Sequence, residues 1–281
     1  METEEENPSK VSPNKYLEKS ENPIELFPNI FSKIPSLIPY KFEIMKGILT
    51  SQDKFIKHAP FDYYREFYIL NNMKIIKKGL EEKERLSSFF PIVFLSTKIS
   101  DMLMSLEKGN VKPKKYQLIY YASLNVAAKY ESQGFIPYLF FEKDLPEALV
   151  TIEEVKKHEN YINRLYNFEY NTVYPTDILC IYQLVDGTYE NKEITKLCRF
   201  LFVFLLFSSE FTDKDKNLVI LTVYYYSKIQ VIKKLNWSNY LQFLTGIEKK
   251  TIIENIKQLL VVIKKYYKVY SYLNNTYYNI I

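Results

Sequence analysis

The side chains best suited to acid–base or nucleophilic chemistry are few in this sequence of 281 residues. It contains two histidines, His58 and His158, and two cysteines, Cys180 and Cys198. No Cys-x-x-Cys pair, no G-x-S-x-G nucleophile motif and no glycine-rich phosphate loop occurs. Metal sites need clustered cysteine, histidine or carboxylate ligands, which the sequence does not offer at ligand spacing. We therefore expect a protein that is not an enzyme and needs no metal or cofactor.

Charge and hydropathy limit the kinds of molecule that this protein is expected to bind. The net charge is +5, from 38 Lys and Arg against 33 Asp and Glu, and the lysines are interspersed with acidic residues. A nucleic-acid binder more often carries a concentrated basic stripe, so nucleic acid is not favoured as a partner. The acidic start Met1–Glu6 differs from a signal peptide, and the longest apolar run, Phe200–Phe207, is too short to span a membrane. These features predict an intracellular protein with a buried helix at 200–207 and no membrane partner.

Glycine and proline predict the class of fold. Only six glycines occur, fewer than a β-sandwich or a dinucleotide-binding fold would need, so an all-α fold is favoured. Seven of the twelve prolines lie in the first 60 residues and none follows Pro175. Residues 1–38 are therefore expected to form an irregular or disordered leader. Apolar residues at helical spacing then predict helices at about 42–56, 67–80, 92–106, 114–131, 140–144, 151–166, 176–186, 191–208, 213–231, 237–245 and 248–270.

The order of these helices repeats. Residues 118–128 and 218–229 are apolar nearly all round, which is typical of a helix surrounded by other helices. Each is preceded by two helices and followed by a short and an amphipathic one. The pattern predicts two tandem five-helix bundles after a Pro-rich leader and an N-terminal helix. The expected boundaries are a leader at 1–38, a first unit with its preceding helix at 39–172, a second unit at 173–271, and a tail at 272–281.

Tyr116–Glu131 is an apolar stretch that ends in small residues, then Lys, an aromatic and Glu. This stretch resembles the third helix of a cyclin box, and with the motifs below, in the correct order, the chain resembles the cyclin family, most closely the mitotic A and B types. The other similar segments are 99–105 for the second helix, 158–169 for the fifth helix, Pro175-Thr176 for the start of a second box, and 237–246 for a Trp-to-Thr-Gly motif. The resemblance covers roughly residues 40 to 270 and implies two cyclin folds.

The resemblance implies structural roles for three residues. In that family an Arg of the first helix and an Asp of the second form a buried pair, and these would be Arg65 and Asp101 here. A Leu of the third helix packs at the centre of the bundle, which would be Leu118. Arg65 and Asp101 have a plainer interpretation, in which each is an ordinary surface residue. Leu118 is expected in the core under both interpretations.

The resemblance also implies a kinase-binding site. Lys129 and Glu159 would face outwards and bind main-chain groups of a kinase, since Lys offers only donors and an ionised Glu only acceptors. Tyr130 and Phe168 are the candidates for an apolar contact with the same partner. Lys129 could instead be an ordinary solvated residue at a helix C-terminus, where the helix dipole favours a cation.

The function implied is that of a regulatory subunit that forms a heterodimer with a cyclin-dependent serine/threonine kinase and activates it. Such a protein controls cell-cycle progression and works in the nucleus and cytoplasm. Asn71 stands where the substrate-docking patch of A- and B-type cyclins has Trp, so docking of Arg-x-Leu substrates is not expected. The alternatives are a paired cyclin-fold transcription factor with a basic second bundle, a transcriptional cyclin, or a helical scaffold that activates no kinase.

Overall fold

Ten α-helices and two short 3-10 helices make up the elements that the computed structural model describes. The described residues are 63–81, 86–107, 111–132, 137, 149–167, 170, 173–211, 213–234 and 237–280. The all-α prediction is confirmed. The leader at 1–38 and the helices expected at 42–56 and 140–144 lie outside the described residues.

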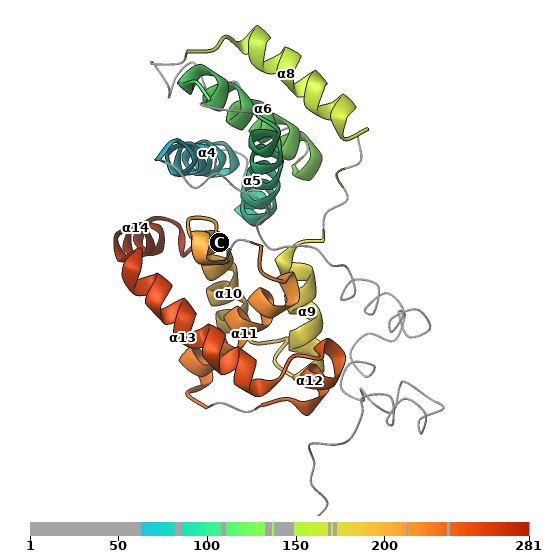
Figure 1. The fold of residues 1–281 in the computed structure, drawn as a ribbon, viewed down its shortest axis with the longest axis vertical. Coiled ribbons are helices and arrows are strands. Elements are labelled where there is room, and N and C mark those ends of the chain that lie inside the picture. Colours follow the sequence, from blue (N-terminus) through green and yellow to red (C-terminus); the bar gives the residue numbers. More distant parts are fainter. Residues whose placement is uncertain are drawn as a thin grey trace, which may run out of the picture.

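The helices form two groups, one above the other in Figure 1. The N-terminal half holds α4 (Tyr63–Glu81), α5 (Phe89–Leu106), α6 (Pro113–Glu131) and α8 (Ile152–Leu165). The C-terminal half holds α9 (Pro175–Val185), α10 (Lys192–Leu205), α11 (Lys216–Ile232), α12 (Asn239–Thr245), α13 (Lys249–Lys265) and α14 (Tyr267–Tyr277). The short helices η4 (Leu86–Ser88) and η5 (Ser209–Phe211) precede α5 and α11.

The N-terminal half is built around α6. This helix begins at Pro113, whose fixed φ suits a first helical turn, and it packs against α4, α5 and α8. Nearly every residue between positions 116 and 128 is buried, as expected of a central helix. Leu118 is an exception: it is partly buried at the edge of the core, while Ile119 is fully buried. Leu118 therefore packs against the core, as expected of a core residue, but from its edge and not at its centre.

The C-terminal half repeats this plan around α11, which contacts α9, α10 and α13. Asp215 caps the start of α11, where its side chain accepts a hydrogen bond of 2.9 Å from the Leu218 amide. The apolar run Phe200–Phe207 is buried throughout, so its assignment to a core helix is confirmed. The 18-residue helix α5 is long and apolar enough to cross a membrane by composition, but 72% of it is buried within the fold.

The C-terminal end departs from the prediction. The helix expected at 248–270 is divided at Tyr266 into α13 and α14, and α14 continues to Tyr277. Leu273 and Tyr277 are buried, and the Tyr277 ring stacks on Phe89 of the other half with 5.6 Å between ring centroids. The expected tail at 272–281 is therefore largely part of the fold, because its aromatic side chains are held by a surface that the sequence alone does not place.

Candidate functional site

Arg65 and Asp101 form a buried ion pair between α4 and α5. Arg65 donates two parallel hydrogen bonds to the carboxylate, Nε to Oδ1 at 2.8 Å and Nη2 to Oδ2 at 2.8 Å. Its Nη1 donates to the carbonyl oxygen of Leu206, which lies just after α10 in the other half. Burial raises the pKa of Asp101, and the guanidinium acts against this shift. All three nitrogen atoms of the guanidinium therefore donate hydrogen bonds, and the one to Leu206 joins the two halves.

Lys129 and Glu159 form a second ion pair, at the rim of the N-terminal half. Lys129 is in the last turn of α6, and its Nζ pairs with Oε1 of Glu159 on α8. The side chain of Lys129 is 48% exposed, whereas that of Glu159 is only 8% exposed. Glu159 was expected to face outwards, and this is wrong. It shares the buried face of α8 with Val155 and Ile162, so the close packing of α8 against α6 turns it inwards.

The helices that carry this pair are fixed by further polar contacts. Thr151 and Glu154 form a capping box at the start of α8. The Glu154 amide donates to the Thr151 hydroxyl at 3.2 Å, and the Thr151 amide donates to the Glu154 carboxylate at 2.8 Å. Lys114, in the first turn of α6, pairs with the same Glu154 at 2.7 Å. Ion pairs at both ends of α6 therefore hold it to α8, which fixes the position of Lys129.

Two aromatic side chains, Tyr130 and Tyr170, lie near the end of α6 that carries Lys129. Tyr130 is 49% exposed, and its ring makes an edge contact with Tyr170 at 5.6 Å between centroids. The Tyr170 hydroxyl donates to Asn163 at 2.6 Å, and burial, with the nearby Glu159 charge, raises the pKa of Tyr170 to about 12. Phe168, the other predicted contact residue, lies outside the described residues. The last turn of α6 thus carries an exposed ammonium group, Lys129, and an exposed ring, Tyr130.

One contact at this site was missed in the sequence. The hydroxyl of Tyr174, just before α9, donates to the carboxylate of Glu131 at the end of α6. Burial and the Glu131 carboxylate raise the pKa of Tyr174, so the hydroxyl stays protonated as a donor. Glu131 is the last residue of the 116–131 segment, and Tyr174 directly precedes Pro175-Thr176. Their position beside these motifs was the one feature of the sequence that could have indicated the contact.

The remaining reactive side chains are dispersed. Among the described residues, no three His, Cys, Asp or Glu side chains gather as metal ligands would. His158 lies on α8 with its ring near Tyr161, and burial lowers its pKa. Cys198 is buried, which raises its pKa to about 12, and Cys180 is partly buried. His58 lies outside the described residues.

Comparison with known proteins adds no family name. No protein-family model matches this chain, and no curated protein is significantly similar to it. The arguments about function therefore depend on the motifs and on the contacts described above.

Proposed function

We propose that this chain is a cyclin-like regulatory subunit that binds and activates a serine/threonine kinase of the cyclin-dependent type. The observation that carries the proposal is the pairing of residues selected from motifs alone. Arg65 pairs with Asp101, 36 positions away, and Lys129 pairs with Glu159, 30 positions away. Two ion pairs between four residues chosen in this way are hard to obtain by coincidence. They support the resemblance of the N-terminal half to a cyclin box.

Lys129 would make the central contact with the kinase. Its ammonium group has three donor hydrogens, one of which is directed at Glu159, so the exposed side remains available to a main-chain carbonyl oxygen. Hydrogen bonds from a charged donor are roughly twice as strong as neutral ones. Glu159 is too buried to bind a partner's amides, and its role becomes that of a positioning residue which holds Lys129 in one orientation. Tyr130 would add apolar contact beside it.

Activation would follow from the rigidity of this surface. A kinase whose active arrangement is populated at about 1% needs roughly 5.5 kcal/mol of differential binding to reach 99%. That difference requires an interface of large signalling size, on the order of 2,000 Å² in total. The capping box and the two ion pairs between α6 and α8 restrain the rim, so that little conformational entropy would be lost when a kinase binds.

A charge swap tests the proposal without breaking the ion pair. The double variant Lys129→Glu with Glu159→Lys keeps opposite charges facing each other but replaces the exposed cation with an anion. We expect phosphorylation of a histone substrate by purified cyclin-dependent kinases to lose its activation by this chain, while the far-UV circular dichroism stays helical. Lys112→Glu is the matched control, since Lys112 is an exposed lysine just before the other end of α6.

Two results would contradict the kinase proposal. One is a charge-swap variant that activates the kinase as well as the original chain does. The other is a panel of cyclin-dependent kinases none of which is bound or activated by the original chain. The control variant must retain activation for the first result to be interpreted.

A further inference from the structure

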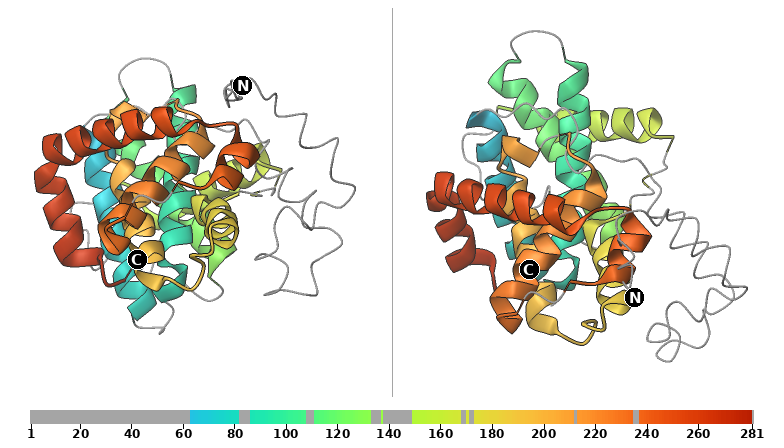
Figure 2. Two further views of the ribbon diagram at one scale, coloured as in Figure 1. Left: turned by 90° about the horizontal axis from the view of Figure 1, so that it is seen from below. Right: turned by 60° about the horizontal axis from the view of Figure 1, so that its bottom comes forward.

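The outer face of α13 carries many lysines and almost no acidic residue. Ile252, Leu259 and Val262 bury one side of this helix against the core. The other side exposes Lys249, Lys250, Lys257 and Lys264, with Glu254 as the one exposed carboxylate of the helix. These four lysines make no ion pair within the described residues, whereas the next one, Lys265, pairs with Glu210. Figure 2 shows α13 crossing the outside of the C-terminal half, with α14 turning away at its end.

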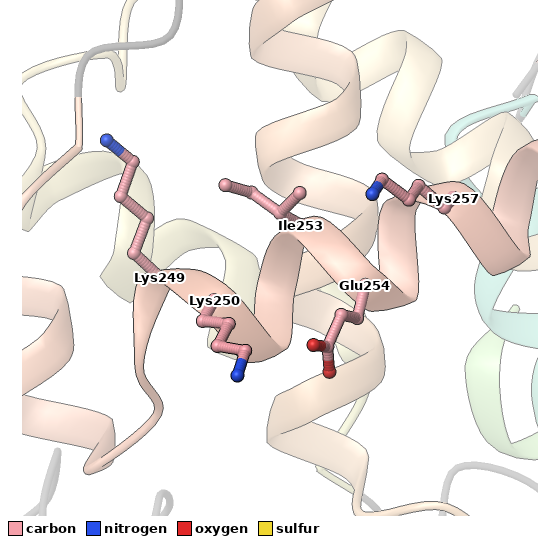
Figure 3. A pocket seen from close by; sticks show the side chains of 5 residues that line it. All are labelled: Lys249, Lys250, Ile253, Glu254 and Lys257. Carbon is pink, nitrogen blue, oxygen red and sulfur yellow. The ribbon is translucent and has the colours of Figure 1, made fainter.

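Apolar side chains alternate with these lysines on the same face. Leu260 is 49% exposed and Val261 is 64% exposed, a large fraction for apolar side chains on a packed helix. Further towards the start of α13 lies a shallow groove of about 470 Å³ lined by Lys249, Lys250, Ile253, Glu254 and Lys257. Figure 3 shows Ile253 between Lys249 and Lys257 on one side of the helix, and Lys250 with Glu254 on the other.

Both kinds of side chain recur at an interval of two helical turns. Lys250, Lys257 and Lys264 are seven residues apart, a rise of about 10.5 Å each. Ile253 and Leu260 have the same spacing. A second helix lying alongside presents its own equivalent positions at this interval, as in paired helices with a seven-residue repeat. A nucleic-acid backbone would meet the lysines but leave the apolar side chains without a partner.

We propose that this α13 lysine face, defined as Lys249, Lys250, Ile253, Lys257, Leu260, Val261 and Lys264, docks an acidic amphipathic helix of a partner protein. Apolar residues of that helix cover Ile253, Leu260 and Val261, and its carboxylates lie opposite the lysine row. Docking removes apolar surface from water and relieves the repulsion between neighbouring lysines. The surface is distinct from the proposed kinase contact, which lies on the N-terminal half.

The test uses a labelled model peptide of about 21 residues, with Leu at the paired positions of three heptads and Glu at the flanking positions. Fluorescence anisotropy with the full chain is expected to show binding that weakens as salt screens the charges. The triple variant Lys250→Glu, Lys257→Glu and Lys264→Glu should weaken binding at least about tenfold. Leu260→Ser should weaken it by a smaller factor, which separates the apolar contribution from the charge contribution.

A matched control reverses three exposed lysines elsewhere, Lys112, Lys192 and Lys234, and should leave binding unchanged. Equal loss in the control and the triple variant would reduce the effect to net charge and overturn the proposal. So would an absence of peptide binding, or tighter binding of duplex DNA or of anionic phospholipid vesicles than of the peptide at the same salt. The charge swap at positions 129 and 159 should leave peptide binding intact, so the two proposals fail separately.

Discussion

The two halves of the molecule use the same packing plan but stabilise it differently. Each has a central helix, and each buries one ion pair at a junction of helices. In the N-terminal half Arg65 meets Asp101 with two parallel hydrogen bonds, so both oxygens of the carboxylate are bound. In the C-terminal half Lys228 on α11 meets Asp186 just after α9, where the Tyr224 hydroxyl donates to the same carboxylate oxygen. Asp101 thus depends on a single partner, Arg65, whereas Asp186 is bound by two side chains, Lys228 and Tyr224.

The outer helices differ more than the cores do. On α8, Glu159 turns inwards and leaves one oriented cation, Lys129, on the rim. On α13, Lys249, Lys250, Lys257 and Lys264 point outwards and make no ion pair within the described residues, and only Lys265 has an acidic partner there. A repeated architecture with different surface chemistry is what we expect if the halves bind different partners. Under the two proposals, the first half makes a narrow, oriented contact and the second a broad electrostatic one.

The largest effect is expected from Arg65→Met. The substitution leaves Asp101 buried without its cation and the Leu206 carbonyl without its donor. Removal of one partner of a buried pair typically costs about 3–5 kcal/mol of unfolding free energy. Urea denaturation followed by far-UV circular dichroism measures this loss. Because Arg65 also joins the halves, a second transition should become visible as they lose their coupling.

A double variant distinguishes the energy of the ion pair from the cost of leaving one charge buried alone. Arg65→Met with Asp101→Leu removes both charges and should recover most of the lost stability, since an apolar pair of similar size suits a buried site. A cost below about 1 kcal/mol for Arg65→Met alone would contradict the role given to this ion pair.

The corresponding change in the C-terminal half, Lys228→Met, should cost less, about 2 kcal/mol. Asp186 would lose its cation at the end of α9, where the helix dipole disfavours a negative charge. It would keep the hydrogen bond from Tyr224, which limits the loss. The same urea experiment compares the two variants directly. If Lys228→Met cost as much as Arg65→Met, the contrast between one partner and two would be wrong.

Much of the fold could be predicted because local signals mark it. Pro113 begins α6, Thr151 and Glu154 cap α8, and apolar runs without a polar face mark the central helices. These features depend on residues close together in the sequence, so no knowledge of the neighbouring helices is needed. The Arg65–Asp101 pair was expected from motifs, which carry information about distant contacts that periodicity lacks. The same motifs selected Lys129 and Glu159, but their pairing with each other was not expected.

The predictions that failed all concern residues whose position depends on which other helix packs against them. Leu118 was placed at the centre, but the rotation of α6 against its neighbours gives that position to Ile119. Glu159 was placed outside, but α8 packs so that it faces α6. The end of the chain looked like a tail because the partner of Tyr277, Phe89, is far away in sequence. In each case the missing information was the direction in which a side chain points, which depends on the neighbouring helix.

The smallest expected effect is the pH dependence that His158 gives to the N-terminal half. Burial lowers the pKa of His158, the Lys115 charge acts in the same direction, and Glu107 opposes them. The unfolded chain therefore binds a proton at a pH where the folded chain does not, so stability is lost as pH falls through the ordinary value of about 6.5.

His158→Phe keeps a ring beside Tyr161 and removes this titration. The fall in Tm between about pH 7.5 and pH 5.5 should be smaller in the variant, measured by thermal melts in matched buffers. An equal fall in both proteins would place the acid sensitivity in carboxylates, and the halves would then not differ in this respect.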